Sequence, residues 1–158
     1  MRIILILFLL VTTSSFAQQK IDVVKFDFIQ KIIDDKSGDI QIINFWATWC
    51  APCVKELPLF EAYNKQAKTD GIKLTLISLD FADKIDKVKN FVKLKKLEST
   101  VILLDELDAN LWIDKVDKSW SGAIPATLIL NTKTGKRKFV EKELADGELE
   151  LLVKEIKE

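Results

Sequence analysis

The chain has 158 residues, 48% of them hydrophobic, and its 24 Lys and Arg residues balance its 24 Asp and Glu residues. A near-neutral protein has little electrostatic attraction for nucleic acid or an anionic membrane surface, so we expect neither as a partner. With two cysteines and no histidine, it lacks the four ligands of a usual zinc site and the cysteines of a disulfide framework. It also lacks a Gly-rich phosphate loop, so we expect no metal and no other bound cofactor.

The first 17 residues have the pattern of a secretory signal peptide. A charged start precedes nine apolar residues, 3–11, and Ser15 and Ala17 supply the small side chains of a cleavage site before Gln18. An uncleaved membrane anchor is the alternative, but a spanning helix needs roughly 20 apolar residues. We expect cleavage, a mature chain that is soluble in the periplasm or another extracytoplasmic compartment, and a single domain over residues 18–158.

The first part of that domain begins with a helix, a strand and a second helix. The Asp-x-x-Gln pattern from Asp27 predicts a capped short helix ending near residues 36–38. Residues 40–46 form an apolar run that is typical of a buried strand. A helix follows from Ala51, and we expect a kink at Pro58, which has no N–H to donate along the helix.

The rest of the domain continues the alternation and ends on a hairpin. The expected elements are a strand at 72–79, a helix capped by Asp83, a strand at 101–104, a short helix within 108–116, strands at 126–130 and 138–142, and a helix from Asp146. Turn residues between the last two strands predict an antiparallel hairpin. From residue 40 onward the order β-α-β-α-β-α-β-β-α predicts an α/β sandwich whose mixed central sheet is flanked by helices.

Both cysteines lie where the strand at 40–46 gives way to the helix. Cys53, Leu57 and Phe60 have the spacing of an inward helix face, whereas Cys50 can remain accessible at the helix start. The free N–H groups there favour a thiolate. We therefore expect Cys50 to attack a disulfide and Cys53 to resolve the mixed disulfide. A structural staple is the alternative, but it would close a loop of only two residues and gain little stability.

The residues around the cysteines resemble the active site of a known protein family. The segment N-F-W-A-T-W-C-A-P-C-V-K-E-L-P at 44–58 resembles the active site of the thioredoxin-like TlpA/ResA family of extracytoplasmic thiol-disulfide oxidoreductases. The resemblance continues through S-L-D at 78–80 and I-P-A-T-L-I-L at 124–130, so it covers the chain from about Ile40 onward. It implies a thioredoxin-like sandwich with Cys50 at the carboxyl end of a parallel strand.

Pro125 is a second expected site residue. A trans proline can simply open a strand, but the resemblance implies that the Ile124–Pro125 bond is cis and faces the dithiol. The backbone of Ile124 would then bind an extended substrate chain beside its disulfide. Ala51 and Pro52, between the cysteines, and Trp49 are further candidates for substrate contact. The other tryptophans are expected beneath the site (Trp46), in the core (Trp112) and on the contact surface (Trp120).

Glu56 is the expected acid-base residue, one helical turn after Cys53. Burial raises the pKa of a carboxyl group, so a buried Glu56 could accept the proton of Cys53. Thioredoxins usually have an Asp at the position of Asn44, which cannot titrate, and the resemblance to ResA-like proteins assigns the role to Glu56. A solvated surface glutamate is the alternative.

The sequence thus predicts a monomeric extracytoplasmic thiol-disulfide oxidoreductase that reduces protein disulfides. The resemblance implies a membrane thiol donor of the DsbD or CcdA kind and, as substrates, disulfide-containing exported proteins such as a cytochrome c apoprotein. A peroxiredoxin-like thiol peroxidase is one alternative, but it needs a Thr and a Pro where Ala47 and Ile43 stand. A non-catalytic binding module with a thioredoxin fold is the other, and it would have no use for an intact C-A-P-C motif.

Overall fold

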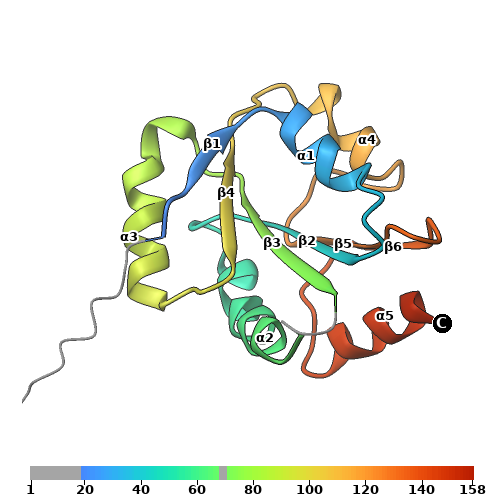
Figure 1. Ribbon diagram of the computed structural model, residues 1–158. Helices are drawn as coiled ribbons and strands as arrows, with labels where there is room; N and C mark the ends of the chain where they lie inside the picture. The colour runs from blue at the N-terminus through green and yellow to red at the C-terminus, as the bar shows by residue number, and fades with distance from the viewer. Residues whose placement is uncertain (1–18, 68–70) are drawn as a thin grey trace, which may run out of the picture.

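The computed structural model describes residues 19–67 and 71–158, so the expected signal peptide at 1–17 lies outside the described residues. The strands of the described part are β1 (Asp22–Val24), β2 (Ile40–Trp46), β3 (Ile72–Ser78), β4 (Thr100–Leu104), β5 (Ala126–Asn131) and β6 (Arg137–Val140). These strands form one sheet in the order β1-β4-β3-β2-β5-β6 (Figure 1). The neighbours from β1 to β2 are parallel, whereas β5 is antiparallel to both β2 and β6. The predicted mixed sheet is confirmed.

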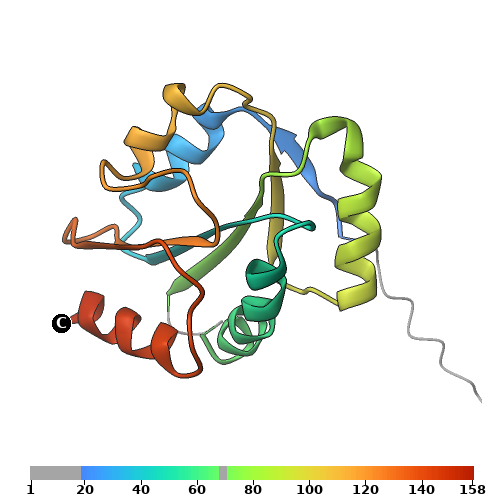
Figure 2. The same ribbon diagram turned by 180° about the vertical axis from the view of Figure 1, so that it is seen from behind.

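Helices cover both faces of this sheet. They are α1 (Phe26–Ile33), α2 (Ala51–Ala67), α3 (Ile85–Lys95), α4 (Ile113–Val116) and α5 (Glu148–Lys157), with short 3-10 helices η1 (Ala82–Lys84) and η2 (Ala109–Leu111). The first core cluster joins α2, α3 and α5 to one face, and the second joins α1 and α4 to the other (Figures 1 and 2). None of the helices in the described ranges has both the length and the apolar composition that crossing a membrane requires. The predicted α/β sandwich is confirmed.

The central strand β2 is buried along all seven residues. Because successive side chains of a strand point to opposite faces, Ile42 and Trp46 enter the cluster beneath α2, whereas Ile43 and Phe45 enter the cluster beneath α1 and α4. Asn44 lies between Ile43 and Phe45 in the strand, so its side chain points to the opposite face, toward α2. It is fully buried, and buried polar groups normally form hydrogen bonds. The strand thus carries a polar contact beneath the helix that begins after the cysteines.

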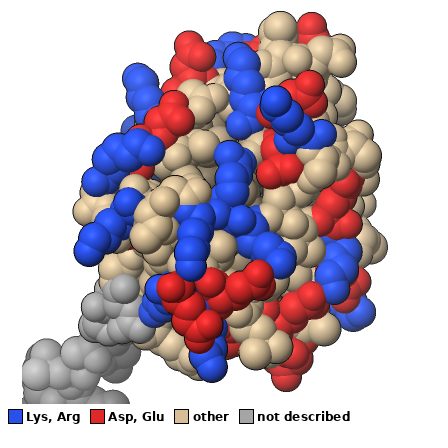
Figure 3. Space-filling view, turned by 90° about the vertical axis from the view of Figure 1, so that its right-hand side faces the viewer, with Lys and Arg blue, Asp and Glu red and all other residues tan. Residues whose placement is uncertain are grey.

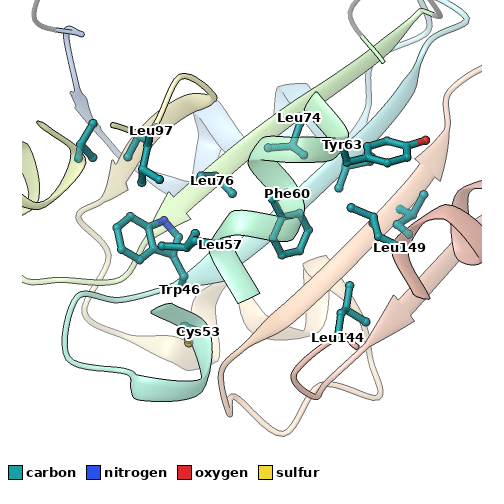
Figure 4. Close-up of a cluster of buried hydrophobic side chains, with 14 of the residues drawn as sticks. Trp46, Cys53, Leu57, Phe60, Tyr63, Leu74, Leu76, Leu97, Leu144 and Leu149 are labelled. Atoms are coloured by element: carbon teal, nitrogen blue, oxygen red, sulfur yellow. The ribbon is translucent and has the colours of Figure 1, made fainter. Parts of the chain in front are cut away.

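The apolar cluster beneath α2 holds this helix on the sheet. Cys53, Leu57 and Phe60 project from α2 into the cluster that also contains Trp46 and Leu76 of the sheet (Figure 4). Leu57 and Phe60 are 2% and 0% exposed, and burying each such side chain contributes roughly 1.5–3 kcal/mol to stability. The packing keeps the first turn of α2 at the carboxyl end of β2.

The surface carries both charges. On the face seen in Figure 3, Lys and Arg side chains are interspersed with Asp and Glu side chains, and neither sign covers the face alone. Ion pairs between exposed partners include Lys138–Glu155 and Lys20–Asp22. Pairs of this exposed kind contribute little to stability, about 0–1 kcal/mol each. The stability of the fold therefore rests mainly on its two apolar clusters.

The first helix differs from its predicted bounds. α1 begins at Phe26, so that Asp27 lies in its first turn and provides no side-chain cap. It ends at Ile33 and does not reach residues 36–38. The physical reason is a local turn, in which Asp35 accepts hydrogen bonds from the N–H and the hydroxyl group of Ser37. Such side-chain bonds compete with helix continuation.

Two other predictions about elements need correction, one strand was not predicted, and one prediction stays open. Asp83 lies inside η1 and caps no helix, because α3 begins only after this 3-10 turn. α5 begins two residues beyond Asp146, after Gly147 in a left-handed conformation that favours glycine (φ 76°). β1 was missed, because its three residues are exposed or half-buried and show no apolar pattern. Pro58 lies within α2 as expected, and the kink there stays a prediction.

Candidate active site

The two cysteines lie at the carboxyl end of β2, where α2 begins. Cys50 immediately precedes the first helical residue, and its carbonyl oxygen accepts the N–H of Val54 at 3.0 Å. The N–H of Cys53 lies 3.3 Å from Sγ of Cys50, and the two sulfurs form a disulfide. A backbone N–H and the positive end of the helix dipole are therefore directed at the Cys50 sulfur, and both favour a thiolate after reduction.

Cys50 is less accessible than the sequence suggests. In the disulfide form it is 6% exposed, against 0% for Cys53. Its neighbours in the chain are exposed, namely Trp49, which is 61% exposed, and Ala51 and Pro52. We call these three residues the contact rim. The difference in exposure between the cysteines has the expected sign.

The segment before β5 forms the opposite wall of the site. The Ile124–Pro125 bond is cis, as the resemblance implies, and Pro125 is buried while Ile124 is half-buried. The carbonyl oxygen of Ile124 lies 3.7 Å from Sγ of Cys50. The register of the sheet explains this approach, because antiparallel β5 pairs Ala126 with Phe45. The start of β5 therefore lies beside the end of β2.

Trp120 supports this wall from inside the protein. Its Nε1 donates a hydrogen bond to the carbonyl oxygen of Ala123 at 2.8 Å, and its ring packs on Phe45 with the centroids 4.6 Å apart. Trp120 is only 4% exposed, so the prediction that it shares the contact surface is wrong. The NH group of the indole needed a buried partner, and the chain just before Ile124 supplies it.

Two other tryptophans lie where they were expected. Trp46 is fully buried in the cluster with Cys53 and packs against Phe91 at 5.4 Å. Trp112 is 5% exposed and stacks on Phe45 in the second cluster. The predictions of Trp46 beneath the site and of Trp112 in the core are confirmed.

Glu56 is buried beside the site, with 1% of its surface exposed. Its Oε1 accepts a hydrogen bond from Nδ2 of Asn44 at 2.8 Å, and its Oε2 accepts one from the N–H of Leu144 at 2.8 Å. Burial raises the pKa of Glu56 to about 7, although these two hydrogen bonds lower it, and the charge of Glu143 raises it further. The alternative of a solvated surface glutamate is wrong, and this carboxyl group can exchange a proton near neutral pH.

Asn44 connects Glu56 to the strand that follows the cis proline. Nδ2 of Asn44 donates a second hydrogen bond, to Oγ1 of Thr127 on β5 at 3.1 Å. The sequence could not reveal Thr127 or Leu144 as partners, since they lie 83 and 88 residues away from Asn44 and Glu56. No group of three or more potential metal ligands occurs in the described residues.

Solved structures with similar folds include two that share more than a quarter of their aligned residues with this chain. The thioredoxin-related protein of Neisseria meningitidis serogroup B has a TM-score of 0.66 and 26% identity, with 77% of this chain and 87% of that chain covered. StoA of Bacillus subtilis has a TM-score of 0.58 and 27% identity, with 73% and 83% covered. The fold is thus the thioredoxin fold.

Curated relatives give similar information over shorter stretches. The sporulation thiol-disulfide oxidoreductase A of Bacillus subtilis (strain 168) is 31% identical over 94 residues, which cover 55% of this chain and 57% of that protein. The thiol-disulfide oxidoreductase ResA of Bacillus thuringiensis subsp. konkukian is 40% identical over 72 residues, which cover 45% and 40%. The chain therefore spans about half the length of these relatives. A family model covers more of it, since it matches residues 16–136 of the 158, and the chain accordingly belongs to the AhpC/TSA family.

Proposed function

We propose that this protein is a thiol-disulfide oxidoreductase that reduces disulfides of other proteins. The observation that supports it most is the Cys50–Cys53 pair at the start of α2, with Sγ of Cys50 3.7 Å from the carbonyl oxygen of Ile124. A reactive sulfur beside the half-buried backbone of Ile124 suits a substrate that approaches as an extended chain. Relatives named thiol-disulfide oxidoreductases support the same activity.

The reaction starts from the reduced pair. The Cys50 thiolate attacks one sulfur of a substrate disulfide, so that a bond forms between Cys50 and that sulfur and the second substrate sulfur leaves as a thiolate and takes up a proton. Cys53 then loses its proton and attacks Sγ of Cys50. The mixed disulfide breaks, the first substrate sulfur leaves as a thiolate and takes up a proton, and the Cys50–Cys53 disulfide remains. Two electrons have passed from the pair to the substrate.

Glu56 is the proposed acceptor of the Cys53 proton. It follows Cys53 by three residues on α2, is buried with it, and has a pKa of about 7, so that its carboxylate form is available near neutral pH. The hydrogen bonds from Asn44 and Leu144 orient both of its oxygens. Pro125 and Ile124 would bind the substrate backbone, and the contact rim would supply apolar contact to it.

The direction, location and partners of the reaction complete the proposal. The signal-like segment at residues 1–17 favours a soluble extracytoplasmic protein. There the dithiol would act as a monomeric reductase, recharged by a membrane thiol donor of the DsbD or CcdA kind. Its substrates would be disulfide-containing exported proteins, with a cytochrome c apoprotein as one candidate. The resemblance to ResA-like proteins supports these partners.

Reduction of insulin with dithiothreitol as electron donor tests the activity. The mature protein should accelerate the precipitation of insulin chains, and the variant with both cysteines changed to serine should give only the uncatalysed rate. Equal rates for the two proteins would remove the enzymatic proposal and favour a non-catalytic binding module.

A peroxiredoxin-like thiol peroxidase is the second candidate, because a Cys50 thiolate at the start of a helix could also attack a peroxide. Ala47 and Ile43 stand where such an enzyme needs a Thr and a Pro, and neither side chain can supply the hydroxyl group. Consumption of hydrogen peroxide by the reduced protein decides between the two. Rapid turnover without an added peroxidase would favour the peroxidase.

A further inference from the structure

Asp80 is the second buried carboxylate near the cysteines. It follows β3 and is 3% exposed. Its Oδ2 accepts hydrogen bonds from the N–H of Thr48 at 2.8 Å and from the hydroxyl group of Ser78 at 2.9 Å, and its Oδ1 accepts the hydroxyl group of Thr48 at 2.5 Å. Both oxygens of the carboxylate therefore serve as hydrogen-bond acceptors.

These bonds attach Asp80 to the turn that presents Cys50. The N–H of Cys50 donates to the carbonyl oxygen of Ala47 at 3.1 Å, which closes a tight turn around Thr48 and Trp49. A second tie lies just before the turn, where the N–H of Leu79 donates to the carbonyl oxygen of Trp46 at 2.8 Å. The carboxylate of Asp80 is therefore fixed to the same short turn as the attacking sulfur.

Within the part of the chain that the structure describes, no Lys or Arg side chain lies within 4 Å of this carboxylate. Of the ion pairs found in residues 19–67 and 71–158, none includes Asp80. The three donors that contact it are neutral groups, and the carboxylate lies in a region shielded from water. Charges in such regions act over longer distances than charges in solvent do.

We propose that the charge of Asp80 lowers the reduction potential of the Cys50–Cys53 pair and thereby makes it a reductant. Reduction adds two electrons and two protons to the disulfide and yields two thiols, and Cys50 then loses a proton to become a thiolate. The negative Asp80 repels that thiolate but has no such effect on the neutral disulfide. It therefore destabilises only the reduced form, and a less stable reduced form means a lower potential. Asp80 would thus act on the direction of the proposed reaction, and this inference rests on the proposed function.

The test is the equilibrium of the pair with dithiothreitol or glutathione redox buffers, followed by the fluorescence of tryptophan or by alkylation of free thiols. Asp80→Asn keeps the shape of the side chain and removes its charge. We expect its equilibrium to shift about tenfold toward the dithiol, which corresponds to about 30 mV. The thiolate fraction of Cys50 at neutral pH, read from its absorbance near 240 nm, should rise in parallel.

Two controls separate charge from structure. Thr48→Val removes a hydrogen bond to Asp80 and leaves the charge. The equilibrium constant of this variant with the redox buffer should therefore stay within about twofold of the wild-type value. Asp35→Asn removes a carboxylate that also accepts hydrogen bonds from an N–H and a hydroxyl group, both of Ser37. This carboxylate lies before the opposite end of β2 from the cysteines. The reduction potential of the variant should therefore equal that of the wild-type protein. An unchanged potential in Asp80→Asn, or an equal shift in Thr48→Val, would overturn the proposal.

A further variant covers the case in which Asp80→Asn does not fold. Phe81 is 64% exposed directly after Asp80, so Phe81→Lys adds a compensating charge without touching the buried bonds. Its potential should rise at low salt, and the rise should fade at high salt because exposed charges are screened. No shift at low salt would also overturn the proposal. The equilibrium needs no protein substrate, so a failed insulin assay would count against the proposed function alone.

Discussion

Nδ2 of Asn44 lies 2.8 Å from Oε1 of Glu56, and this bond joins the central strand to the helix of the cysteines inside the protein. Both side chains are almost fully buried. The amide donates to the carboxylate and so offsets part of the effect of burial on the pKa of Glu56. Without such donors a buried carboxyl group would stay protonated well above neutral pH, and it could not accept the proton of Cys53.

Glu56→Gln tests the role of that carboxylate. The first attack by Cys50 should change little, because its thiolate is stabilised by the start of α2. The second step should slow on the order of 100-fold near pH 8, since the general base is missing. Stopped-flow kinetics with a peptide disulfide would resolve the two steps. In the wild-type protein the second step should accelerate as the pH rises through about 7, the pKa of Glu56, and the variant should lack this inflection.

A matched control for that experiment is Glu150→Gln, which changes an exposed glutamate on α5. Its kinetics should equal those of the wild-type protein. If the second step of Glu56→Gln is as fast as in the control at every pH, Glu56 does not accept the proton of Cys53.

Asn44→Ala should move the inflection of the second step to higher pH. The hydrogen bond from Asn44 lowers the pKa of Glu56, so its loss raises the pKa above about 7 and leaves less carboxylate at neutral pH. Thr127→Val is the control, because it removes the other partner of Asn44 and keeps both hydrogen bonds of Glu56. The pH profiles of the two variants give the measurement, and an unshifted profile in Asn44→Ala would contradict the prediction.

Single cysteine variants should separate attack from resolution. Cys53→Ser can still form a mixed disulfide through Cys50 but cannot break it from within, so it should accumulate a covalent adduct with a disulfide substrate. Cys50→Ser should form none, because Cys53 is fully buried. Non-reducing gel electrophoresis reads out the adducts. An adduct with Cys50→Ser and none with Cys53→Ser would reverse the two roles.

Much of the fold could be predicted because its signals are local. The apolar run of β2 and the helical spacing of Cys53, Leu57 and Phe60 each follow from neighbouring residues, and the structure contains both elements as expected. Errors arose where a boundary depends on a weak or nonlocal feature. The pairing of β1 with β4 joins segments about 80 residues apart. The three partly exposed residues of β1 have no hydrophobic pattern that predicts this pairing.

The residues of the site likewise divide into those that local sequence predicts and those whose contacts come from distant segments. The C-A-P-C motif and Pro125 are visible in the sequence, whereas the environment of Glu56 is assembled from distant segments. Leu144 reaches Glu56 through its backbone N–H, which any residue except proline offers, so its identity carries no signal. Trp120 was misplaced because closeness to Pro125 in sequence does not tell on which side of the wall a side chain lies.

The dependence of stability on pH provides a prediction that needs no substrate. The pKa of Glu56 is about 7 in the folded protein, against 4.5 for an ordinary glutamate. Between pH 4.5 and about 7, the folded state therefore binds the proton of Glu56 more tightly than the unfolded chain does. The contribution of Glu56 to stability is therefore fully present below pH 4.5 and is lost as the pH rises through about 7.

The size of that loss follows from the shift of the pKa, and it amounts to about 3 kcal/mol at most. Urea denaturation of the disulfide form at pH values from 4 to 8 should show the free energy of unfolding of the wild-type protein falling relative to that of Glu56→Gln. The comparison cancels the contributions of the other carboxylates, several of which have lowered pKa values and act in the opposite direction. A constant difference between the two proteins across this range would mean that Glu56 titrates normally in the folded state.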